Sequence, residues 1–131
     1  MARPTFFRNR ITGYSGSINA DVSEDVEKGD IVIVTGTRKG KLIVSLADSQ
    51  YRKKSTGLLF VATHKCAAGF GSTFATYMVF PLTGETKAGD PIFLRKKGKW
   101  GLNKTKTSKQ VGIILEGDGE NHALVAPQGS Y

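Results

Sequence analysis

Two matching segments, each opened by a Gly-Asp dipeptide, constrain the fold of this chain more than any other feature. The dipeptide at 29–30 precedes the apolar run 31–34, and the dipeptide at 89–90 precedes the apolar run 91–94. In both copies a basic turn and further short apolar runs follow in the same order. Internal repetition of this kind predicts two related units of supersecondary structure that pack together.

The apolar runs of both copies have the character of β-strands. They are short, they are rich in β-branched and aromatic residues, and Gly, Pro, Asn, Asp or Lys turns bound them. The chain is therefore predicted to be all-β, a compact sandwich or barrel made of two related halves, at about 27–84 and 87–129. The later runs that we match between the copies are 42–44 with 100–102, 57–61 with 111–115, and 78–84 with 123–129.

Glycine and aspartate suit the start of each copy for separate reasons. Glycine tolerates positive φ, and an aspartate side chain accepts hydrogen bonds from backbone amides of the same turn. The Gly-Asp pair is thus expected to mark where the next strand begins.

The first 20 residues lie outside the repeat and are predicted to form an extended N-terminal arm, with the β-domain covering 21–131. Residues 3–10 of the arm carry two aromatic residues among three arginines and have no evident pairing partner in the repeat, which suits a segment that docks on another molecule. Its candidate contact residues are Arg3, Pro4, Phe6, Phe7, Arg8 and Arg10.

A second segment outside the repeat, 66–77, is rich in glycine and small residues and is predicted to be a long loop. The sequence Gly-Phe-Gly-Ser-Thr lacks the Gly-Lys-Ser/Thr ending of a phosphate-binding loop, so a nucleotide site is not expected here.

The charge of the chain is unevenly distributed. The net charge is +8, an acidic stretch covers 21–30, and a basic stretch covers 95–109. Such polarity fits a nucleic acid or an acidic protein surface as partner, and it also fits a solvated face that keeps the protein soluble. Charge alone leaves these three interpretations open.

No constellation of catalytic residues emerges from the sequence. The single cysteine, Cys66, cannot form an internal disulfide, and with two histidines no Cys/His cluster has metal-ligand spacing. Cys66 follows His64 and Lys65, which suits an activated thiol, but an inert buried thiol is the favoured interpretation. We therefore expect a protein that is not an enzyme and that needs no cofactor or metal.

The hydropathy of the sequence indicates where the protein is expected to be found in the cell. No apolar run approaches the ~20 residues that cross a bilayer, and the N-terminus has no apolar stretch of signal-peptide length. A soluble protein made in the cytoplasm, without a membrane partner, is the expectation.

One local resemblance concerns 28–41, which resembles the opening of a KOW motif of ribosomal and transcription-elongation proteins. It implies a small SH3-like barrel whose Lys-Gly turn presents main chain and cations to RNA phosphates. The glycine that the motif expects three residues after Gly40 is Ile43, and the second copy departs further from the pattern. A nucleic-acid-binding β-barrel is therefore the alternative function.

A second resemblance covers about 21–129. The Ala-Gly-Asp-Pro-Ile-Phe-Leu of 88–94, the Val-Gly-Ile of 111–113 and the Pro-Gln-Gly of 127–129 resemble landmarks of tailed-phage capsid decoration (cement) proteins. The resemblance implies a β-tulip domain, commonly a homotrimer, on the outer surface of the head. An arm would reach across the major capsid proteins and stabilise the shell of a virion whose proteins are made in the host cytoplasm.

In this resemblance the arm is the capsid-binding site. The loop 66–77 is where the sequence departs from the family, and its aromatic residues are candidate subunit contacts. The residues assigned to those contacts are Phe70, Phe74 and Tyr77.

Overall fold

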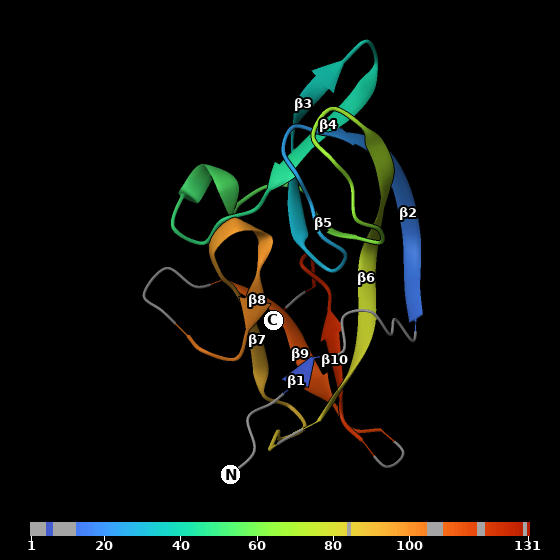
Figure 1. Cartoon of the computed structure of the whole chain (residues 1–131). Helices are drawn as coiled ribbons and strands as arrows, with labels where there is room; N and C mark the ends of the chain where they lie inside the picture. The colour runs from blue at the N-terminus through green and yellow to red at the C-terminus, as the bar shows by residue number, and fades with distance from the viewer. Residues whose placement is uncertain (1–4, 7–12, 84, 105–108, 118–119, 130) are drawn as a thin grey trace.

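The computed structural model describes residues 5–6, 13–83, 85–104, 109–117, 120–129 and 131, and these form ten β-strands and two short 3-10 helices (Figure 1). The all-β prediction is thereby confirmed. The strands are β1 Thr5–Phe6, β2 Gly13–Val22, β3 Ile31–Arg38, β4 Lys41–Leu46, β5 Leu59–Ala62, β6 Gly71–Thr83, β7 Pro91–Leu94, β8 Trp100–Gly101, β9 Gln110–Leu115 and β10 His122–Val125. The 3-10 helices are η1 Arg52–Lys54 and η2 Lys96–Gly98.

Five strands close into a barrel in the order β2-β4-β3-β5-β6. Closure occurs because β2 pairs with β4 on one edge and with β6 on the other. The β2–β4 pair is parallel and the other pairs of the barrel are antiparallel. Closure pairs the two outer strands of this part of the sheet with each other at 20–22 and 42–44.

The long strand β6 leaves the barrel and pairs with β10, continuing the sheet through β9, β7 and β8 (Figure 1). The antiparallel order β8-β7-β9-β10 of this second sheet repeats the antiparallel order β4-β3-β5-β6 of the first. The two halves thus share one strand order, and β6 joins them.

Backbone hydrogen bonds align the two copies residue by residue. Gly29 N donates to the carbonyl of Ala62, which in turn donates its N–H to Asp30 O. Gly89, Ile114 and Asp90 make the same two bonds in the second copy. Ala62 therefore corresponds to Ile114, and the match of 57–61 with 111–115 expected from sequence is wrong by two residues. Short apolar runs look alike in either register, which explains the error.

The buried side chains form two clusters that share strand β3. Ile31 and Ile33 lie in the core between the two halves, and Val32 lies in the core of the barrel. Both faces of this strand are thus covered at 31–33, which explains its unbroken β-branched run.

Two sequence predictions about loops and the arm require correction. Residues 13–20 belong to β2, which completes the barrel, so they are not part of an arm. The loop predicted over 66–77 is limited to 66–70, because β6 begins at Gly71 and runs for 13 residues. In both cases pairing between distant segments overrides low local strand propensity, since 71–79 pair with 13–21.

Candidate functional site

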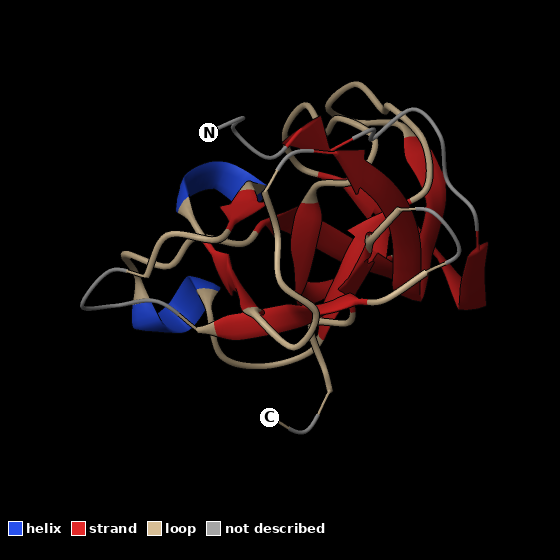
Figure 2. Ribbon diagram, turned by 90° about the horizontal axis from the view of Figure 1, so that it is seen from below, coloured by secondary structure: helices blue, strands red, loops and turns tan. Residues whose placement is uncertain are grey.

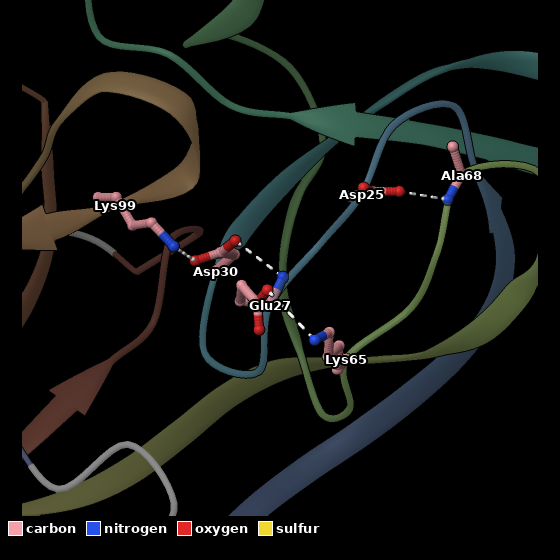
Figure 3. Close-up of polar contacts among 6 residues, drawn as sticks. All are labelled: Asp25, Glu27, Asp30, Lys65, Ala68 and Lys99. Carbon is pink, nitrogen blue, oxygen red and sulfur yellow. Dashed lines mark hydrogen bonds and ion pairs between the residues drawn. The ribbon is translucent and has the colours of Figure 1, made fainter.

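The first Gly-Asp pair is a buried junction between the two halves (Figure 3). Asp30 is 2% exposed. Its Oδ2 accepts a hydrogen bond from Glu27 N at 3.0 Å, and its Oδ1 accepts one from Lys99 Nζ at 2.7 Å. Trp100 Nε1 donates to the carbonyl of Gly29 at 2.7 Å. Two consecutive residues of the second half therefore bind the turn that opens the first, and the carboxylate is held by structural bonds.

The same turn occurs three times in the chain. Its glycine has φ of +87° at Gly29, +89° at Gly69 and +96° at Gly89, values that favour glycine. In each turn the residue after the glycine donates its N–H to the carbonyl three residues earlier. Sequence reasoning missed the copy at Gly69 because Phe70 stands where the others have aspartate; the shared Ala-Gly of 68–69 and 88–89 was the available signal.

The turns at 29 and 69 lie against each other. Val26 and Cys66 exchange backbone hydrogen bonds at 2.8 and 2.9 Å, and the carboxylate of Asp25 accepts a bond from Ala68 N at 2.9 Å (Figure 3). An exposed ion pair joins Lys65 to Glu27 at 3.9 Å. Part of the acidic stretch thus fixes the path of the chain around Cys66.

The thiol of Cys66 is buried in the barrel core, and its pKa is raised, first by desolvation and then by the charges of Asp21 and Asp25. A raised pKa keeps the thiol protonated at neutral pH and therefore unreactive. His64 is exposed on a bend, with Nδ1 2.8 Å from Thr63 Oγ1. This geometry supports the interpretation of Cys66 as an inert core residue.

Within the described ranges, no group of three or more His, Cys, Asp or Glu side chains is arranged to hold a metal ion. Nor does any described helix have the length and apolar character to cross a membrane.

The predicted arm is described at Thr5 and Phe6, whose backbones pair with Thr83 and Leu82 of β6. The other candidate arm residues lie outside the described residues: Arg3, Pro4, Phe7, Arg8 and Arg10. The described part of the arm thus runs beside the end of β6.

The three candidate subunit contacts have different environments. Phe70 is 68% exposed and Tyr77 is 37% exposed, so both can reach another molecule. Phe74 is fully buried in the barrel core and is not available for a subunit contact, which corrects its assignment. The prediction failed because Phe74 lies on strand β6, which turns its side chain into the core, and not in a loop.

The basic stretch 95–109 is dispersed over several environments. Arg95, Lys96 and Lys97 are exposed at η2, Lys99 pairs with Asp30, and Lys109 Nζ donates to Ser55 O at 3.3 Å. The stretch therefore contributes both to packing and to an exposed basic surface.

Comparison with known proteins finds a likeness of fold. No family model matches the chain, and no curated protein matches it. Among solved structures, the head fiber gp8.5 N base of bacteriophage phi29 is similar, with a TM-score of 0.53 and 13% sequence identity. The alignment covers 88% of this chain and 98% of the phage chain. At this identity the similarity shows that the two chains share a fold.

Proposed function

We propose that this chain is a structural protein of a bacteriophage virion, and specifically a non-enzymatic decoration protein that binds the outer surface of the head. The observation that carries the proposal is the fold shared with a phage head fiber base over 88% of the chain. The sequence landmarks at 88–94, 111–113 and 127–129, which resemble those of phage capsid decoration proteins, also support the proposal.

The proposed mechanism is mechanical. A DNA-filled head is under outward stress, and a protein that bridges neighbouring major capsid proteins adds contacts that must break before the shell opens. In this mechanism the arm supplies the anchors Phe6 and Phe7, because burying one phenylalanine contributes about 1.5–3 kcal/mol. A homotrimer would present three arms at once and raise their effective concentration at the head.

The alternative is a nucleic-acid-binding β-barrel, which the exposed cations at η1 and η2 favour. Binding through phosphates falls steeply as salt rises, whereas docking through buried phenylalanines is less sensitive. Salt dependence therefore separates the two functions.

The direct test is co-sedimentation of the full chain with purified heads of the phage that encodes it, prepared without this protein, at low and high salt. We expect saturable binding that weakens only modestly at high salt and a solution mass near three times 14.1 kDa. A monomer that does not bind heads but shifts RNA on a gel would support the alternative.

A further inference from the structure

The two 3-10 helices, one from each half, lie on the same side of the molecule (green and orange coils in Figure 1, blue in Figure 2). Three backbone N–H donors fix the two segments together. Ser49 N donates to Arg95 O at 3.1 Å, Lys97 N to Asp48 Oδ2 at 3.3 Å, and Gly98 N to Ala47 O at 2.6 Å. The segments that carry η1 and η2 therefore form one continuous surface.

This surface is strongly basic. Segments 47–58 and 94–98 contain one acidic residue, Asp48. Asp48 is buried, and its carboxylate accepts hydrogen bonds from the backbone N–H groups of Gln50 and Lys97. The exposed cations, which with the two apolar residues below define the η1–η2 surface, are Arg52, Lys53, Lys54, Arg95, Lys96 and Lys97. Six like charges held together repel one another, and a partner of opposite charge would relieve that repulsion.

Two exposed apolar side chains flank η1 in the sequence, Tyr51 directly before it and Leu58 four residues after it. Tyr51 is 55% exposed and Leu58 is 59% exposed. Tyrosine and arginine are enriched in protein–protein interfaces, and a leucine contributes when an apolar pocket covers it. Phosphates would leave Leu58 uncovered, and Lys54 Nζ already occupies a face of the Tyr51 ring at 5.5 Å from its centroid. Base stacking on Tyr51 would have to compete with that contact.

From this combination we infer that the η1–η2 surface is a docking site for an acidic, partly apolar surface of the head's major capsid protein. The inference rests on the proposed function and adds a second contact beside the arm. Charge complementarity here would set the rate and orientation of docking, and Tyr51 and Leu58 would prolong the bound state.

The test compares two double variants with the same change in charge, R52E/K53E on the η1–η2 surface and R38E/K41E at the tip of the β3–β4 hairpin, with L58S as a third variant. All four positions are exposed, and circular dichroism confirms folding. Head binding is measured by co-sedimentation at low and physiological salt, together with gel shifts on a DNA duplex. We expect at least a tenfold loss of head affinity for R52E/K53E, a smaller loss for L58S, and affinity within twofold of the unaltered chain for R38E/K41E.

The outcomes separate the inference from the proposed function. If the unaltered chain does not bind heads, the proposed function fails and the docking site fails with it. If the unaltered chain binds and R52E/K53E binds equally well, or loses no more than R38E/K41E, only the η1–η2 docking site is overturned. A duplex shift that R52E/K53E abolishes, with head binding unchanged, would also overturn it and assign the surface to nucleic acid.

Discussion

Lys99 Nζ lies 2.7 Å from the buried Oδ1 of Asp30, so the second half of the chain is bonded to the turn that starts the first. The neighbouring hydrogen bond from Trp100 Nε1 to the Gly29 carbonyl belongs to the same junction. The ring centroids of Trp100 and Phe80 lie 5.3 Å apart. The repeat seen in the sequence is therefore a pair of halves that depend on each other for their polar contacts.

The two Gly-Asp pairs differ in burial, and their variants should differ in stability. Asp30→Ala leaves Glu27 N and Lys99 Nζ without their acceptor, which we expect to lower the free energy of unfolding by about 2 kcal/mol. Asp90→Ala, at a half-exposed position, is the matched control and should cost less than about 0.5 kcal/mol. Urea unfolding followed by Trp100 fluorescence measures the free energy of unfolding of both variants. Equal losses would contradict the structural role of Asp30 at the junction.

Close packing between β9 and β10 predicts a strong effect of one added methyl group. A Cβ at Gly112 would lie 2.3 Å from the carbonyl oxygen of Leu124, which the sheet cannot accommodate without moving a strand. Gly112→Ala should destabilise by about 2 kcal/mol, whereas Gly36→Ala, with no atom within 4 Å, should change stability by less than about 0.5 kcal/mol. Thermal unfolding compares the two, and equal midpoints would disprove the β9–β10 contact.

The buried thiol predicts a pH dependence with a definite sign. Burial raises the pKa of Cys66, so the unfolded chain loses the thiol proton at a lower pH than the folded chain does. The stabilising contribution is complete below the thiol pKa of the unfolded chain and is lost as the pH rises through the folded pKa. The stability difference between the unaltered chain and Cys66→Ala should thus be constant near neutral pH and shrink in alkali.

Because the thiol of Cys66 is buried, it should react slowly with a maleimide in native buffer and quickly in urea. Fast labelling of the folded protein at pH 7 would show that Cys66 is an activated thiol.

The arm can be tested apart from the β-domain. Deleting residues 1–10 removes β1, which contributes two residues of pairing, and leaves β2 from Gly13 to Val22 intact. We expect a folded domain with little change in melting temperature that no longer binds heads. Phe6→Ala with Phe7→Ala should reduce affinity more than Arg8→Gln with Arg10→Gln, because rim charges contribute only about 0–1 kcal/mol each. Retained binding by the deleted chain would refute the role of the arm.

The strands of the repeat could be predicted because their side chains either are apolar on both faces of the strand or alternate between buried and more exposed positions. Ile31 to Val34 and Ile92 to Leu94 lie in strands where the sequence places them. The polar run 13–19 and the small residues Gly71 to Thr73 carry no such pattern. They are strands because β2 and β6 pair side by side, 13–19 with 73–79 and 71–73 with 19–21. That pairing also buries Phe74, which local sequence leaves exposed.

The η2 part of the η1–η2 surface was visible in the sequence as the basic stretch 95–109. The apolar component of that surface was not, because Tyr51 and Leu58 look like ordinary apolar residues until the fold leaves them exposed. The position of the η1 segment beside η2 depends on Asp48, whose carboxylate accepts a hydrogen bond from the backbone N–H of Lys97 in the other half. Contacts across such a distance in the chain have no local sequence signal.

The proposed function requires this protein to stabilise a phage head from outside. Heads of the encoding phage that lack the protein can be heated with a DNA-binding dye while purified protein is added in increasing amounts. We expect the temperature of DNA release to rise and then saturate as the sites on the head fill. An unchanged release temperature at saturating protein, or no bound protein on the heads, would contradict the proposed function.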